Sequence, residues 1–154
     1  MKENSPLQYT LTYQKHLILS IIGLYLDSAL KWNKQVLQLC SNVSRKLALL
    51  SRLRKILDKK LLNLLYISMI QPKLDYGISV WGYCSDANRR LIVRLQHRAA
   101  RIITGNMDYV NTRGENLVKE LGWQSIENRR DCFTAVLMYR CINEIAPRRL
   151  IDEA

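Results

Sequence analysis

The sequence predicts a mainly α-helical protein, a compact bundle of about five or six helices preceded by a short β-hairpin. Apolar residues recur every three or four positions from Asn33 onward, which is the period of an amphipathic helix. An alternation with a period of two is found only near the start of the chain, in Tyr9–Tyr13. The apolar fraction of 48% over 154 residues is sufficient for one packed core.

The first 30 residues carry the predicted hairpin. Tyr9–Tyr13 alternates aromatic, β-branched and apolar residues, which favours a short strand. Leu17–Leu26 is rich in Ile and Leu, and we expect it to form a second, more buried strand. This apolar run is shorter than the roughly 20 residues that a membrane-spanning helix needs. We therefore expect an intracellular protein, nuclear or cytoplasmic, that is neither secreted nor bound to a membrane.

The first helices are bounded by capping residues and one proline. Asn33 is a candidate N-cap, and Asp58 is expected to cap a second helix from Lys59 to about Gln71. Pro72 has no N–H to donate, so it should kink or restart the chain before a short helix over residues 73–81. The apolar face of the first helix is predicted to consist of Val36, Leu39, Cys40, Val43, Leu47, Leu50 and Leu57.

Caps also define the later helices. Ser85 and Asp86 precede a strong helical pattern over residues 87–104, which Gly105 is expected to end. A loop over residues 106–114 and a short helix over 115–121 follow. Ser125 is expected to cap the last helix, which should run to about Ile145. The predicted organisation is a hairpin over residues 1–30, a helical domain over 31–147 and a tail over 148–154.

The chain is strongly basic, with 24 Lys and Arg against 13 Asp and Glu, a formal charge of +11. An excess of this size favours a polyanionic partner, nucleic acid first and an acidic membrane surface second. A basic surface that is simply solvated is the alternative. Two windows hold most of the excess, Arg45 to Lys60 and Asp86 to Arg101.

The second window gives the sharper prediction. At about 100° per residue, four of its arginines fall on one stripe of a helix, and the apolar residues cover the other side. Like charges stacked in this way repel one another, and guanidinium groups match the geometry of phosphate. The stripe therefore indicates contact with a phosphate backbone, although its arginines could instead pair with Glu115, Glu120, Glu127 or Asp131. It consists of Arg90, Arg94, Arg98 and Arg101.

The first window is less specific because its charges point in several directions around a helix. We weigh phosphate contact and plain solvation about evenly for it, and expect Arg54, which falls near the apolar stripe, to snorkel or pair internally. The candidate nucleic-acid contacts in this window are Arg45, Lys46, Arg52, Lys59 and Lys60.

Other reactive residues do not form a recognisable site. His16 and His97 have no neighbours at the spacing of a catalytic relay, and the four cysteines lack metal-ligand spacing. The sequence predicts no metal site, no cofactor and no small-molecule substrate. Tryptophans at helix ends usually close a core, with base stacking as the minority interpretation; they are Trp32, Trp81 and Trp123.

Four motifs follow one another along the chain. They are Gly23-Leu24-Tyr25-Leu26-Asp27 with Leu30 and Trp32; Leu65-Tyr66 with Ile70, Pro72, Leu74, Tyr76-Gly77 and Val80-Trp81; Gln96 with Arg98-Ala99-Ala100-Arg101 and Thr104-Gly105; and Leu121-Gly122-Trp123 with Glu127, Arg129-Arg130 and Ala146-Pro147. As an ordered set, they resemble the carboxy-terminal region of reverse transcriptases from LINE-type, non-LTR (jockey-like) retrotransposons.

This resemblance implies a function. The strand that contains Gly23 would lie near the end of a polymerase palm, and the helices after it would form the thumb and the region beyond, which hold template–primer nucleic acid. The acidic motif of the catalytic palm is absent from the sequence. We therefore expect a truncated RNA-directed DNA polymerase that holds an RNA–DNA or DNA duplex without catalysis of its own, so that it is not an enzyme alone. The alternative is a structural helical module that packs against a polymerase palm or a host protein and binds no nucleic acid.

Overall fold

The computed structural model describes residues 23–25, 31–143 and 145. This part of the chain is mainly helical, as predicted, and contains no strand. The predicted hairpin lies almost wholly outside the described residues and receives no support from them, and the predicted tail also lies outside. The helices are α2 (Asn33–Leu53), α3 (Lys59–Leu65), the π-helix η1 (Tyr66–Ile70), α4 (Gln71–Asp75), α5 (Ile78–Trp81), α6 (Asp86–Thr104), α7 (Gly114–Glu120) and α8 (Ile126–Ile142).

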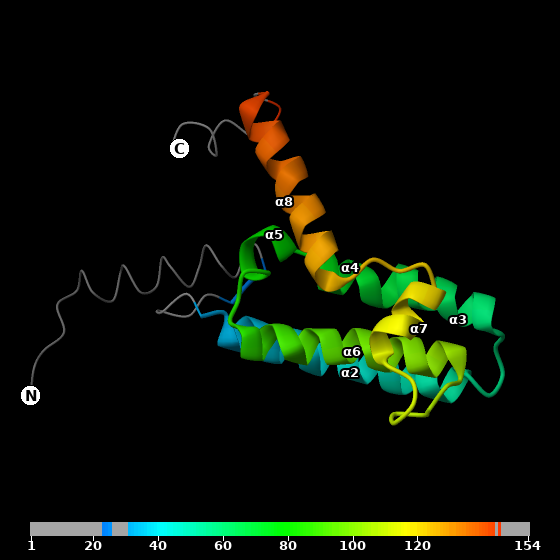
Figure 1. Cartoon of the computed structure of the whole chain (residues 1–154). Helices are drawn as coiled ribbons and strands as arrows, with labels where there is room; N and C mark the ends of the chain where they lie inside the picture. The colour runs from blue at the N-terminus through cyan, green and yellow to red at the C-terminus, as the bar shows by residue number, and fades with distance from the viewer. Residues whose placement is uncertain (1–22, 26–30, 144, 146–154) are drawn as a thin grey trace, which may run out of the picture.

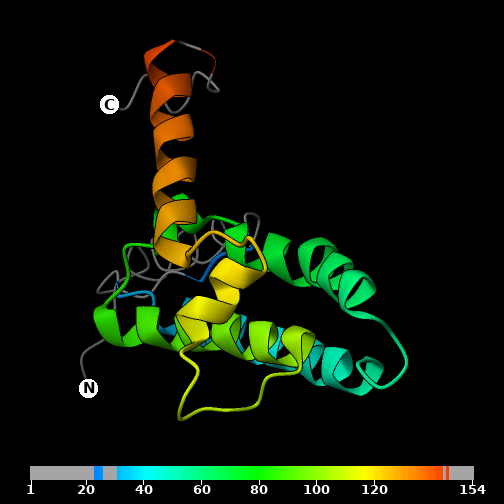
Figure 2. The ribbon, with the colours of Figure 1, turned by 45° about the vertical axis from the view of Figure 1, so that its right-hand side comes forward.

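Helices α2 and α6 lie side by side and form the lower layer of the body in Figures 1 and 2, with α3 and α4 above them. A buried amide joins them, because Asn88 Nδ2 donates hydrogen bonds to Asn33 Oδ1 at 2.8 Å and to the Lys31 carbonyl at 3.2 Å. The apolar faces predicted from the helical period meet in the core. Buried residues are Val36, Leu39, Val43, Leu47 and Leu50 on α2 and Ile92, Leu95, Ala99, Ile102 and Ile103 on α6.

Most of the predicted caps are confirmed. The side chains of Asp58, Ser85 and Ser125 accept hydrogen bonds from backbone N–H groups at the starts of α3, α6 and α8. Gly105 ends α6 with a φ of 78°, a left-handed conformation that favours glycine. The predicted Asn33 cap is wrong, because the cap position is Trp32 and Asn33 is already the first helical residue.

Pro72 restarts the helix without turning the chain away. α3, η1 and α4 follow one another without a gap, and in η1 the N–H of Gln71 donates to the Tyr66 carbonyl, five residues back. We attribute this wider turn to the ring of Pro72, which would clash with an ordinary α-helical turn. The predicted single helix over residues 73–81 is wrong, since α4 ends at Asp75 and α5 begins at Ile78.

Gly77 makes the turn between α4 and α5. Its φ is 66°, and a Cβ at this position would lie 3.0 Å from Leu24 Cδ1. The turn also places Trp81 in the core, where its side chain is fully buried and Nε1 donates to the Tyr76 carbonyl at 2.7 Å. Glycine therefore suits this position both for its left-handed conformation and for the close approach of Leu24.

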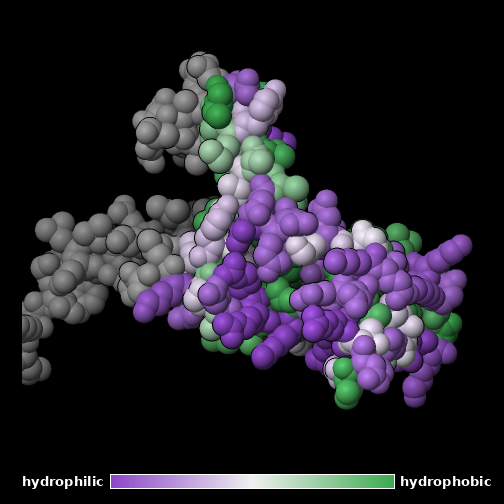
Figure 3. Space-filling view, viewed as in Figure 1, coloured by the Kyte–Doolittle hydropathy of each residue, from purple (hydrophilic) through white to green (hydrophobic). Residues whose placement is uncertain are grey.

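Helix α8 departs from the predicted compact bundle. It packs against α5 and the neighbouring part of α6 near its start, and its outer end rises away from the body (Figures 1 and 2). The side chains at that end are largely apolar and exposed (Figure 3). α8 ends at Ile142 and α2 at Leu53, both short of the predicted ends. None of the described helices combines the length and the apolar character of a membrane span.

Candidate nucleic-acid interface

Three of the four predicted stripe arginines form an exposed row on α6. Arg90, Arg94 and Arg98 are exposed and follow one another at a spacing of four, which separates neighbours by about 6 Å along the helix axis. Among the described carboxylates, none pairs with these three guanidinium groups. The row of Arg90, Arg94 and Arg98, called the arginine row below, therefore presents uncompensated positive charge to solvent.

Arg101 does not belong to this exposed row, which corrects the sequence prediction. Its side chain is only 5% exposed. Nη1 donates to the Asp108 carbonyl at 2.8 Å and Nη2 to the Thr112 carbonyl at 2.6 Å, and the guanidinium lies 4.3 Å from the centre of the Tyr109 ring. The helical period placed Arg101 on the correct face of α6, but the loop between α6 and α7 covers that end of the stripe.

The acidic residues named as possible partners of the stripe are engaged elsewhere or lie away from it. Glu120 pairs with Lys59 at 2.6 Å, and Asp131 pairs with its neighbour Arg130 at 2.8 Å. Glu115 and Glu127 line a hollow on the α7 side of α6. Within the described ranges, the arrangement does not support the interpretation that internal ion pairs neutralise the arginine row.

The second predicted cluster divides into residues with different surroundings. Arg45 and Arg52 are exposed on α2, and Arg45 donates to the side chain of Asn42. Lys60 is exposed at the start of α3, whereas its neighbour Lys59 is held by Glu120. Lys46 is half-buried and lines an apolar pocket between α2 and α3. The cluster is thus not brought together into one surface comparable with the arginine row.

Arg54 pairs internally, as expected. Its Nη2 donates to the Gly105 carbonyl at 3.5 Å, at the C-terminal end of α6. A cation is favourable there because the carbonyl groups at a helix end carry partial negative charge. Arg54, which is itself exposed, therefore lies at the C-terminal end of α6 in a position that favours a cation.

A hollow of about 510 Å³ lies between α6, α7 and the start of α8, and none of the three arginines of the row lines it. His97 lines it, and burial lowers the pKa of its imidazole while the Glu115 carboxylate opposes this shift. Gly114 lets α7 begin directly over this ring, because a Cβ there would lie 2.4 Å from His97 Cγ. The described residues contain no cluster of three His, Cys, Asp or Glu side chains that could hold a metal ion.

Several structural contacts around the site were not found by sequence reasoning. Arg129 binds Asp75 with two hydrogen bonds and so fixes the start of α8 on α4. Trp123 stacks on Tyr66 with the ring centres 3.8 Å apart, and its Nε1 donates to Asn63 Oδ1 at 2.9 Å. This supports the core interpretation of Trp123 over base stacking. The hydrogen-bonded pairs are 54 and 60 positions apart, a separation that no periodic pattern reveals.

Comparison with known proteins supports the broader part of the resemblance found in the sequence, a relation to retrotransposon reverse transcriptases. The chain is similar to the probable RNA-directed DNA polymerase from transposon X-element of Drosophila melanogaster, with 32% identity over 89 residues. It is related to a retrotransposon reverse transcriptase. The similarity covers 54% of this chain and 10% of the Drosophila protein, so the chain spans a small part of that polymerase's length. No family model and no solved structure matches the chain.

Proposed function

We propose that this chain is a fragment of a LINE-type, jockey-like retrotransposon reverse transcriptase that holds template–primer nucleic acid through α6 and has no polymerase activity alone. In this proposal the helices correspond to the thumb and the region beyond it. The arginine row contacts the phosphate backbone, and the contact is independent of base sequence. The exposed row without acidic partners among the described residues is the observation that carries the proposal.

The dimensions of the row suit a nucleic-acid backbone. Arg90 and Arg98 are separated by about 12 Å along α6, and a duplex presents one phosphate per strand every 3.4 Å or so. The row can therefore meet about three phosphates, each with a group that forms paired hydrogen bonds to phosphate oxygens. The similarity to an RNA-directed DNA polymerase supports an RNA–DNA or DNA duplex as the ligand.

Fluorescence anisotropy with a labelled RNA–DNA duplex of about 20 base pairs tests the proposal across a series of salt concentrations. Neutralising three phosphate contacts by replacing Arg90, Arg94 and Arg98 with Gln should reduce the slope of log K against log salt by about 2–3. Affinity at low salt should fall at least about tenfold.

A charge-matched control separates the row from the general basic surface. Lys73, Arg113 and Arg140 are exposed, lie on three other segments and are not involved in the proposed contact. Replacing these three with Gln should change the slope and the affinity much less. Equal losses in the two triple variants, or binding that does not respond to salt, would contradict the proposal.

A second function is favoured by α8. Its outer half exposes an unusual number of large apolar side chains for a helix in water, which is typical of a helix that another surface covers. This supports the structural alternative, a helical module that packs on a polymerase palm or a host protein. The exposed residues are Phe133, Val136, Leu137, Met138, Tyr139 and Ile142.

The two functions give different results with the purified chain. A packing module should bind an apolar dye and self-associate, and the substitutions Val136→Gln, Met138→Gln and Ile142→Gln should abolish both effects. Failure of these substitutions to change either dye binding or sedimentation excludes the packing function. Duplex binding by the same variant should equal that of the original chain, because α8 lies outside the proposed nucleic-acid contact.

A further inference from the structure

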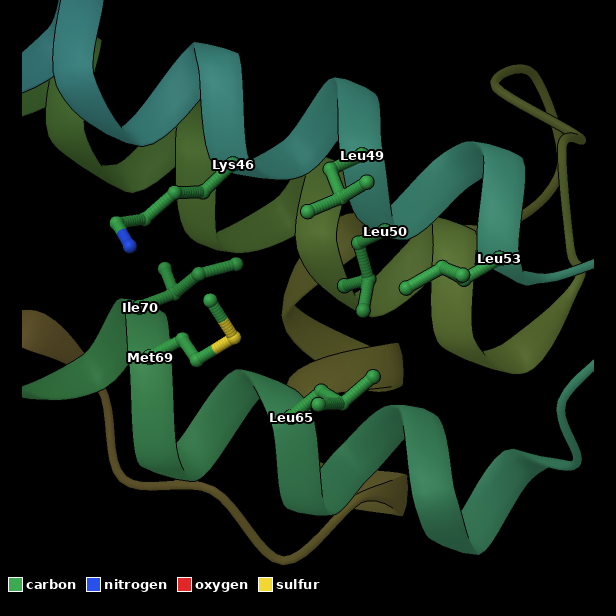
Figure 4. A pocket seen from close by; sticks show the side chains of 7 residues that line it. All are labelled: Lys46, Leu49, Leu50, Leu53, Leu65, Met69 and Ile70. Atoms are coloured by element: carbon green, nitrogen blue, oxygen red, sulfur yellow. The ribbon is translucent and has the colours of Figure 1, made fainter.

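An apolar pocket opens between α2 and the rod formed by α3 and η1 (Figure 4). Its floor is made by Leu50 and Ile70, which are buried. The other residues that line it are Leu49 and Leu53 from α2, Leu65 and Met69 from α3 and η1, and Lys46. No residue of α6 lines the pocket, so it is separate from the arginine row.

Leu61 does not line the pocket but continues the apolar side of α3 beside it, and the pocket together with Leu61 is called the groove below. Leu61, Leu65 and Met69 follow one another at a spacing of four and therefore share one side of the α3–η1 rod. Opposite them, α2 contributes Leu49 and Leu53 (Figure 4). Leu49 is 47% exposed and Leu61 48% exposed, which is high for leucines that flank a pocket.

The size of the pocket indicates what it can accept. Its volume of about 20 Å³ is little more than the 10–15 Å³ or so that one water molecule needs. This excludes a nucleotide or a metabolite of similar size. The pocket has room for the terminal methyl group of one aliphatic side chain carried by a partner segment, as when the tip of a knob from one helix enters the space between two others.

The charge on the helices that form the groove is of one sign, while the nearby carboxylates of Asp58 and Glu120 are engaged in capping α3 and in pairing with Lys59. Helices α2 and α3 and the π-helix η1 contain no Asp or Glu, whereas Arg45, Lys46, Arg52 and Lys60 lie on or beside them. Arg52 and Lys60 are exposed and pair with none of the described carboxylates. A partner that fills the groove therefore needs apolar residues at its centre and acidic residues at its edges.

We propose that the groove between α2 and α3–η1 binds an acidic amphipathic helix of a protein partner. Such a helix places apolar side chains at i, i+3, i+4 and i+7 in the groove, with carboxylates beside Lys46 and Arg52. Nucleic acid would satisfy the charges but would leave Leu49, Leu61 and Met69 uncovered. The π-helical turn of η1, a rare element often found at functional sites, forms one wall of the groove.

A panel of labelled helical peptides of about 16 residues tests this proposal. Every peptide carries leucine or isoleucine at i, i+3, i+4 and i+7, and the flanking positions are Glu, Gln or Lys. The Glu series should bind with micromolar affinity and at least about tenfold more tightly than the Lys series. Absence of binding by every Glu peptide overturns the proposal.

Variants of the chain then locate the binding site. Leu49→Gln with Met69→Gln should weaken the Glu peptides at least about tenfold, because the apolar walls are lost. Leu37→Gln is the matched control, since Leu37 is a more exposed leucine of α2 that does not line the pocket. Lys46→Glu with Arg52→Glu should reverse the preference toward the Lys peptides. The proposal is overturned if Leu37→Gln weakens the Glu peptides as much as the Leu49/Met69 substitutions do. It is also overturned if the Lys46/Arg52 variant still prefers the Glu peptides.

Other occupants of the groove are distinguishable outcomes. Sedimentation that shows self-association lost in the Leu49/Met69 variant would assign the groove to a second copy of the chain. Anionic lipid vesicles that bind the original chain but not this variant would assign it to a membrane surface. Either result replaces the protein partner and overturns the proposal. Duplex binding through the arginine row should be unchanged in the Leu49/Met69 variant, so the two proposals succeed or fail separately.

Discussion

The two ends of one arginine stripe on α6 have opposite roles. Arg90, Arg94 and Arg98 stand in solvent without described acidic partners, whereas Arg101 is buried under the loop that joins α6 to α7. Arg101 lies seven residues after Arg94, so the two side chains leave the helix in nearly the same direction. The difference therefore comes from what the rest of the chain places over each position.

The comparison shows why a basic stripe is an incomplete guide to a binding surface. Arg101 uses its hydrogen-bonding capacity on the carbonyls of Asp108 and Thr112 and covers the ring of Tyr109. A guanidinium engaged in this way organises a loop and cannot also reach a ligand. The exposed arginines have the same chemistry without such partners among the described residues, which is the property that a phosphate contact requires.

The largest expected effect is a difference in protein stability between substitutions at the two ends of the stripe. Arg101→Ala removes two charge-assisted hydrogen bonds and should lower the free energy of unfolding by about 2–4 kcal/mol. Arg94→Ala, on the exposed part of the same stripe, should change it by no more than about 0.5 kcal/mol. Urea denaturation followed by circular dichroism measures both. Similar destabilisation by the two substitutions would show that the stripe is not divided as described.

A methyl group added at Gly114, the first residue of α7, should disturb the α6–α7 loop at the end farther from Arg101 in the sequence. A Cβ there would meet Cγ, Nδ1 and Cβ of His97 at 2.4 to 2.6 Å, so α7 must shift away from α6. Gly114→Ala should therefore cost about 1–3 kcal/mol and reduce the hydrogen-exchange protection of Leu117 and Val118.

The control for this substitution is Gly122→Asn. Gly122 has a φ of 69°, and a Cβ at this position would meet no atom within 4 Å, so an asparagine encounters only the modest cost of a left-handed conformation. It should destabilise the protein less than Gly114→Ala. An equal or larger loss at Gly122 would contradict the steric explanation.

Much of the helical architecture could be predicted from the sequence because it is encoded locally. The apolar period located the faces of α2 and α6, and single residues such as Asp58, Ser85 and Ser125 located helix starts. Trp32 was missed as the cap of α2 because a left-handed tryptophan breaks the usual preferences.

The candidate site could be predicted only in part. Three arginines of the row follow from the helical period, but the burial of Arg101 depends on a loop whose fold the sequence pattern does not specify. The pairing of Arg129 with Asp75 and the stacking of Trp123 on Tyr66 are tertiary contacts of the same kind. The apolar α2–α3 groove was missed because leucines at its walls repeat with the same period as core leucines.

The smallest expected effect concerns the carboxylate that shapes the loop over Arg101. The Asp108 carboxylate accepts hydrogen bonds from the backbone N–H of Asn111, from the Asn111 side chain and from the backbone N–H of Val110. These bonds hold the pKa of the Asp108 carboxyl below its usual value. A lowered folded-state pKa stabilises the loop at neutral pH, and this contribution is lost as the pH falls from about 3.9 through the folded pKa.

Nuclear magnetic resonance of the Val110 and Asn111 amides measures this titration directly. Their shifts should change together with a midpoint below that of a free aspartate, and the Asp108→Asn variant should lack the transition. Because the side chain is exposed and screened by solvent, the variant should leave the global unfolding midpoint nearly unchanged at neutral pH. A midpoint at or above about 3.9 would mean that these hydrogen bonds do not hold the loop, and the burial of Arg101 would then need another cause.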